Sequence, residues 1–174
     1  MKRIGYFLLL LGGILAGCGN SADNKMGLDN RRIVQHENGT LLLSIDDADC
    51  YNDNTNPIAN TAEWNAFFVK SGRYDIWLLS ATRDTMSLNY RNPVRLHFND
   101  INIDANPRCD NIIVDAENIP DSYFMANSYI GTVYIQDTGA IDVQFISEQI
   151  LPPGEYDYVD SRFVSLCFKP EIKK

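Results

Sequence analysis

The stretch EWNAFFVKSGRYDIWLL, residues 63–79, decides the fold class. Apolar and polar side chains alternate on both sides of Ser71-Gly72, which is the period of a β-strand with one buried face. We therefore expect two strands, Glu63–Val69 and Arg73–Ala81. Gly72 can adopt the positive φ of a tight turn, so the two strands are expected to form a hairpin.

The rest of the chain repeats this pattern. Short runs rich in β-branched and aromatic residues are separated by Gly, Asn, Asp and Pro, and helical periodicity is almost absent. Residues 102–119 and 147–160 are expected to be irregular connections. Seven strands with turns between them predict an all-β sandwich or barrel. The expected strands are Thr40–Ile45, Glu63–Val69, Arg73–Ala81, Val94–Phe98, Gly131–Ile135, Ala140–Ile146 and Arg162–Phe168.

A second hairpin is expected around Asp137-Thr138-Gly139, where Gly139 supplies the positive φ. Alternation also assigns the two faces of each strand. The side chains expected to meet in the core are Tyr74, Ile76, Leu78, Ile141, Val143 and Phe145. The side chains expected on outer faces include Trp77, Asp142 and Gln144.

The first 18 residues, MKRIGYFLLLLGGILAGC, have the features of a bacterial lipoprotein signal. The apolar run is shorter than the about 20 residues of a membrane-spanning helix, and its small-residue end matches a lipobox at Cys18. We expect residues 1–17 to be removed as a signal peptide, and residues 18–36 to form a lipidated tether. Residues 37–174 are then one β-sandwich domain, anchored in the cell envelope on the outer membrane, facing the periplasm or the cell surface.

The charge balance limits the classes of molecule that we expect the chain to bind. Removal of residues 1–17 takes Lys2 and Arg3 from the 15 basic residues and leaves 13 against 23 acidic residues, a net charge of −10. Nucleic acid is therefore not an expected partner, because phosphate binding needs a basic surface. The expected contact with a membrane is made through the lipid anchor at Cys18.

The cysteines beyond Cys18 are odd in number, so one thiol at least stays free within the chain. Cys167 lies in an apolar strand and is expected to be a buried free thiol. Cys50 and Cys109 lie in polar sequence, and the spacing leaves open whether they form a disulfide.

The order of core residues in 63–69 and 71–78 resembles the strand pair of jelly-roll carbohydrate-binding modules, which has the pattern W-x-F-x-V followed by x-G-x-Y-x-V-x-L. The likeness continues through residues 131–143 and the final strand, and it is similar to the family 6 and family 35 modules and to galactose-binding-like domains. It implies a jelly-roll β-sandwich with Trp64 in its core. In these modules the last strand carries an Asn for sugar and an Asp for structural calcium, and the corresponding positions here are Arg162 and Val164.

Val164 cannot bind a metal, whereas Arg162 can donate hydrogen bonds to sugar hydroxyls or pair with a uronate. No cofactor is expected from these positions. One cluster does concentrate the oxygen ligands that Ca²⁺ prefers, but it lacks the spacing of an EF-hand. The favoured interpretation is a solvated turn, in which such side chains cap the backbone, and a calcium site is the alternative. Its four carboxylates are Asp46, Asp47, Asp49 and Asp53.

Aromatic side chains are the other candidates for binding, because sugar rings stack on them. Trp77 is expected on an outer face, either as a platform or covered by another segment. Tyr156 and Tyr158 alternate with acids in an expected loop. The sequence thus predicts a noncatalytic glycan-binding lipoprotein that uses Trp77, Tyr156, Tyr158 and Arg162.

Two other functions stay open at this point. The same fold could dock another envelope protein without a sugar ligand, over a broad and flat face. A hydrolase is the third reading, although the sequence contains no GxSxG, HExxH or phosphate-loop motif, and His36 and His97 lie in no triad-like spacing.

Overall fold

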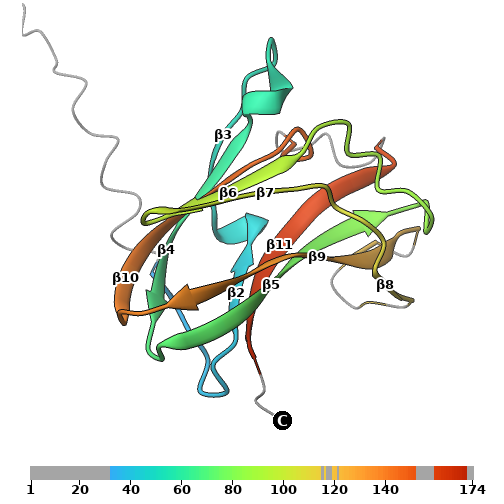
Figure 1. Ribbon diagram of the computed structural model, residues 1–174. Helices are drawn as coiled ribbons and strands as arrows, with labels where there is room; N and C mark the ends of the chain where they lie inside the picture. Colours follow the sequence, from blue (N-terminus) through green and yellow to red (C-terminus); the bar gives the residue numbers. More distant parts are fainter. Residues whose placement is uncertain (1–31, 115, 117–118, 121, 152–158, 172–174) are drawn as a thin grey trace, which may run out of the picture.

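The computed structural model describes residues 32–114, 116, 119–120, 122–151 and 159–171, and in this part of the chain the regular structure is β-strand with two single-turn 3₁₀ helices. The strands form two sheets that pack face to face as a jelly-roll β-sandwich (Figure 1). The all-β class is confirmed. None of the described helices has the length and apolar character of a membrane span.

The first sheet has the order β1-β4-β10-β6-β7, with β3 also paired to β4. Its strands are β1 (Ile33–Val34), β3 (Asp49–Tyr51), β4 (Thr61–Phe68), β6 (Val94–Phe98), β7 (Ile101–Ala105) and β10 (Gly139–Ile146). The second sheet has the order β2-β11-β5-β9-β8. Its strands are β2 (Leu41–Ser44), β5 (Gly72–Thr82), β8 (Asn111–Ile113), β9 (Phe124–Ile135) and β11 (Ser161–Pro170). The two 3₁₀ helices are η2 (Ile45–Asp47) and η3 (Pro57–Ala59).

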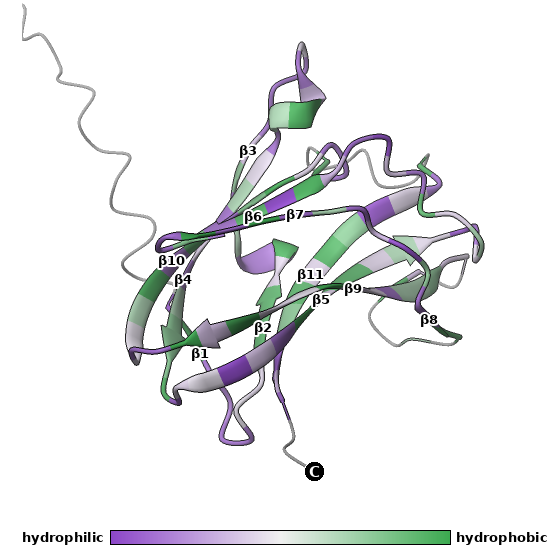
Figure 2. Ribbon diagram, in the orientation of Figure 1, coloured by the Kyte–Doolittle hydropathy of each residue, from purple (hydrophilic) through white to green (hydrophobic). Residues whose placement is uncertain are grey.

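The core lies between the two sheets and follows the alternation of the sequence (Figure 2). The six side chains expected there are all buried, and Asp142 and Gln144 point outward as expected. Trp64 is 1% exposed, packs edge-on against Phe163 with ring centroids 6.1 Å apart, and donates its Nε1–H to the Ser44 carbonyl over 2.7 Å. The core position of Trp64 is confirmed.

Both expected hairpins are wrong, although short connections do lie at the two predicted positions. β4 pairs with β10 in the first sheet, whereas β5 pairs with β11 and β9 in the second, so Ser71-Gly72 connects the two layers. Residues 136–138 likewise join β9 of the second sheet to β10 of the first. The alternation of apolar and polar residues shows which face of a strand is buried. It does not show which other strand pairs with it.

The expected irregular connection at 102–119 contains two strands. β7 pairs with β6 through the turn Asn99-Asp100, in which Asn99 has a φ of 48°. β8 pairs with the start of β9, which begins at Phe124 rather than Gly131. These strands carry polar or small residues at many positions, so they lack the apolar runs that mark the others.

The expected tether, residues 18–36, does not extend as far as residue 36 in the structure. Residues 32–36 belong to the sandwich, because β1 pairs in parallel with β4 and the Gln35 side chain is buried. The Gln35 amide donates to the Gly39 carbonyl and the Tyr74 hydroxyl, and its oxygen accepts from the backbone of Val69 and Lys70. Gln35 therefore closes the β4–β5 connection. Residues 1–31, with Cys18, lie outside the described residues.

Candidate functional site

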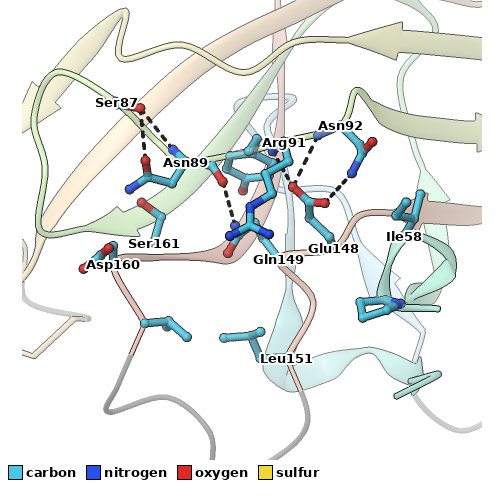
Figure 3. A pocket seen from close by; sticks show the side chains of 13 residues that line it. Ile58, Ser87, Asn89, Arg91, Asn92, Glu148, Gln149, Leu151, Asp160 and Ser161 are labelled. Carbon is cyan, nitrogen blue, oxygen red and sulfur yellow. Dashed lines mark hydrogen bonds between the residues drawn. The ribbon is translucent and has the colours of Figure 1, made fainter. Parts of the chain in front are cut away.

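One end of the sandwich holds a cavity of about 880 Å³, which we call the loop pocket (Figure 3). Four segments meet there: the start of η3, the connection from β5 to β6, the residues after β10, and the residues that lead into β11. The described residues that line it are Pro57, Ile58, Ser87, Asn89, Tyr90, Arg91, Asn92, Glu148, Gln149, Leu151, Val159, Asp160 and Ser161.

Glu148 organises this pocket. Its carboxylate accepts hydrogen bonds from the backbone N–H of Arg91 and Asn92 and from the Asn92 side-chain amide. Gln149 adds a second link. Its side-chain amide donates to the Asn89 backbone carbonyl over 3.3 Å, and its backbone carbonyl accepts from the Phe163 N–H on β11. The connection from β5 to β6 is thus tied to the residues that follow β10, and Glu148 is a positioning residue.

Tyr90 anchors the same connection from beneath. Its hydroxyl lies 2.8 Å from the Ser80 hydroxyl on β5, and burial raises the pKa of the Tyr90 phenol. The phenol therefore stays protonated across the physiological pH range and serves the fold as a neutral hydrogen-bonding group.

Arg91 brings the only basic side chain to the described lining of the loop pocket. Its side chain is exposed and extends across the pocket beside Gln149, and no described residue forms an ion pair with it (Figure 3). The backbone of Arg91 is held by Glu148, so the guanidinium is presented from a fixed base. Donors of this kind next to amide groups and apolar side chains such as Ile58 and Leu151 suit a small polar ligand.

The sequence missed Arg91, because it lies in a connection without an apolar pattern. The available signal is composition: Asn89, Asn92 and Pro93 are residue types common in loops, and loops carry binding residues more often than strands do. Tyr156 and Tyr158 lie outside the described residues. Leu151 and Val159, the described residues on each side of 152–158, both line the loop pocket.

Arg162 and Trp77 do not line the loop pocket. Both lie on the outer face of the second sheet, where the Arg162 guanidinium lies 5.6 Å from the centre of the Tyr123 ring. Trp77 is partly buried in the middle of that face, beside Tyr129 and Lys169. The outward orientation of Trp77 is confirmed, but the structure does not bring Trp77 and Arg162 into one site.

In the acidic cluster, the Asp53 side chain stabilises the local turn. The Asp53 carboxylate accepts from the backbone of Thr55 and Asn56 and from the Thr55 hydroxyl, and these bonds lower the pKa of Asp53. Asp46 and Asp47 lie exposed in η2, and Asp49 lies in β3. Within the described ranges, no three His, Cys, Asp or Glu side chains gather as metal ligands would.

Calcium is expected to leave the melting temperature unchanged, because Val164, which has no ligand atom, stands where the modules that the sequence resembles carry the Asp for structural calcium. A ligand that binds the folded state would raise the melting temperature. Thermal unfolding with CaCl₂, with MgCl₂ at equal ionic strength as the control, measures this. A rise that a chelator reverses and that Asp47→Ala removes would contradict the expectation.

The three described thiols are free: Cys50 is exposed, Cys109 half-buried and Cys167 buried, as expected for the last. Partial loss of solvent around each sulfur raises the pKa of all three. They stay protonated at neutral pH, whereas a nucleophilic cysteine needs a lowered pKa.

Comparison with known proteins supports the fold. No protein-family model matches the chain, and no curated protein matches it significantly. The α-L-fucosidase from Vibrio sp. strain EJY3 matches 83% of this chain with a TM-score of 0.62 and 15% identity, and the chain spans 25% of that enzyme. At this identity the likeness shows a shared β-sandwich fold and no more.

Two further structures are more distant. A family 35 carbohydrate-binding module from Clostridium thermocellum matches 76% of this chain and 98% of the module, with 15% identity and a TM-score of 0.42. The Podospora anserina GH26-CBM35 β-(1,4)-mannanase matches 79% of this chain and 29% of the enzyme, with 9% identity and a TM-score of 0.47. Neither score is high enough to support an argument about function.

Proposed function

We propose that this chain is a noncatalytic glycan-binding lipoprotein of the bacterial cell envelope, active in polysaccharide handling. The observation that carries the proposal is the loop pocket, in which Arg91 stands beside polar side chains on loops fixed by Glu148. Arg91 donates to sugar hydroxyls, while Asn89 and Gln149 add amide groups. Tyr156 and Tyr158, between the two pocket-lining residues Leu151 and Val159, supply the rings on which a sugar stacks.

The lipid anchor at Cys18 completes the proposal. A mature net charge of −10 disfavours nucleic acid, and an acyl anchor holds the domain on the membrane with the pocket free to meet glycans. The resemblance to carbohydrate-binding modules in the order of core residues supports the same class of ligand.

Replacement of Arg91 by alanine is expected to weaken glycan binding about tenfold, because hydrogen bonds to a charged group contribute roughly 1.5 kcal/mol or more. The melting temperature should stay unchanged, since the side chain is exposed. A glycan array with the chain from residue 19 onward identifies the ligand, and calorimetry then compares the variants.

Arg95→Ala is the matched control, because Arg95 is an exposed arginine on β6 outside the pocket, 3.6 Å from Asp104. Tyr156→Ala and Tyr158→Ala should each weaken binding about fivefold, as expected for a lost stacking contact of roughly 1 kcal/mol. An intact chain that binds no glycan on a broad array would favour the alternative, a lipoprotein that docks another envelope protein.

A further inference from the structure

The outer face of the second sheet carries an ordered set of side chains away from the loop pocket. Three neighbouring strands contribute to it, and cross-strand pairing places their outward residues in rows. We call this set the outer platform. From β9 it contains Tyr129, Thr132 and Tyr134; from β5 Trp77, Asp75 and Arg73; and from β11 and the residue after it Cys167, Lys169 and Glu171.

Aromatic side chains lie at both ends of the platform. At one end the Trp77 and Tyr129 rings meet edge to face, with centroids 5.5 Å apart, and Tyr129 is 45% exposed. At the other end Tyr134 is 61% exposed. The Tyr129 backbone N–H donates to the Asp110 carboxylate over 2.8 Å, which fixes the strand beneath the first ring.

Two hydrogen bonds join Tyr129, Thr132 and Asp75 between the aromatic ends. The donor and acceptor in each bond follow from the groups involved. Thr132 Oγ1 lies 2.6 Å from Asp75 Oδ1, and because an ionised carboxylate only accepts, Thr132 must donate there. Thr132 has one hydroxyl hydrogen, so the Tyr129 hydroxyl donates to Thr132 over 2.6 Å. Lone pairs on Tyr129 and Asp75 thus stay available to accept hydrogen bonds from a ligand.

Donors stand next to these acceptors. Lys169 is the cross-strand neighbour of Asp75, and its Nζ lies 5.5 Å from the centre of the Trp77 ring. Arg73 lies 3.1 Å from Glu171 in an exposed ion pair. The platform therefore combines exposed rings with paired donors and acceptors, and its two acidic and two basic side chains cancel in charge.

We infer that the outer platform is a second binding surface, and that its ligand is an extended, neutral oligosaccharide. Rings next to mixed donors and acceptors fit the apolar faces and hydroxyls of sugars. The exposed Asp110 beside Tyr129 adds a further negative charge, so the surface has no excess of positive charge, and this favours a neutral chain over a polyanion. The centre of a protein interface is poor in charged residues, whereas four of the nine platform residues are charged, so a protein partner fits less well.

The spacing of the strand positions that carry the two tyrosines indicates the length of the ligand. Trp77 and Arg73, the β5 partners of Tyr129 and Tyr134, are four residues apart, which corresponds to about 13 Å along a strand. This is the separation of the backbone positions that carry the two tyrosines, and a surface of that length suits several sugar units in a row better than one. This surface shares no residue with the loop pocket and acts independently of it.

Calorimetry with cellohexaose, xylohexaose and mannohexaose, and with glucose, xylose and mannose, tests the inference on the chain from residue 19 onward, which contains the whole described fold. At least one hexasaccharide should bind tenfold or more tightly than its monosaccharide. Tyr134→Ala and Tyr129→Ala should each weaken that binding about fivefold. Thr132→Val, which replaces the central hydroxyl with a methyl group, should weaken it as well.

Tyr51→Ala is the matched control, because Tyr51 is a tyrosine 57% exposed on β3 of the other sheet. Tyr134 keeps the test valid if the Tyr129 variant unfolds, since its ring is the more exposed. Hexasaccharide binding that Arg91→Ala removes and Tyr134→Ala leaves unchanged would assign the sugar to the loop pocket and overturn the platform. Absence of binding to all three hexasaccharides would overturn it as well, whereas binding that only the platform variants weaken would leave the loop pocket without support.

Discussion

Cells that produce the Cys18→Ala chain are expected to incorporate no labelled fatty acid into it. Lipid transfer needs the Cys18 thiol as acceptor, and processing at the lipobox follows lipidation, so the variant should also keep residues 1–17. Metabolic labelling with a fatty acid measures the first effect, and the mobility of the protein on a gel measures the second. The expected change is complete loss rather than a reduction.

Cys167→Ser is the control for this experiment, because it removes another thiol of the same chain and leaves Cys18 in place. The control chain should be labelled as strongly as the unaltered one. Labelled fatty acid in the Cys18→Ala chain would contradict both the anchor and the proposed location in the envelope. The glycan-binding proposals would stand unaffected, since they depend on residues of the sandwich.

Trp64→Ala is expected to lower the free energy of unfolding by about 3–5 kcal/mol, the usual cost of truncating a large buried aromatic side chain. The indole fills the space beside Phe163 between the sheets, and its N–H satisfies the Ser44 carbonyl at the end of β2. The substitution leaves a cavity and removes that hydrogen bond together. Urea unfolding followed by circular dichroism measures the change.

Trp64→Phe separates the two effects. It keeps most of the apolar volume and loses the N–H donor, so it should cost less than the alanine variant, by an amount that reflects the cavity. Tyr134→Ala, at an exposed position, should be close to neutral. A near-neutral Trp64→Ala would show that the core does not depend on this side chain.

The sequence predicted the buried faces well because alternation follows directly from strand geometry. Tyr74, Ile76 and Leu78 were placed correctly from their spacing alone, and so was the outward position of Trp77. Strand partners were predicted poorly. The turn at Ser71-Gly72 looks the same whether the chain folds back within one sheet or crosses to the other, and only the long-range pairing of β4 with β10 decides between them.

The candidate sites were predicted only in part, because strand alternation gives the orientation of a side chain but not its neighbours from distant segments. Trp77 could be selected because its outward orientation follows from the strand period, but its partner Tyr129 is about fifty residues further along the chain, on a strand whose start was not expected. Arg91 had no local signal beyond its loop composition. Its placement comes from hydrogen bonds to Glu148, which is 57 residues away in sequence.

The position of the last strand bears on when the protein can fold. β11 is synthesised after the other described strands, yet it lies inside the second sheet between β2 and β5, so that sheet stays split in two until residues 161–170 have emerged. Such dependence on distant pairings slows folding and leaves strand edges open meanwhile. For a chain that crosses a membrane unfolded on the proposed lipoprotein route, the delay is an advantage, because the second sheet cannot close before β11 itself has crossed.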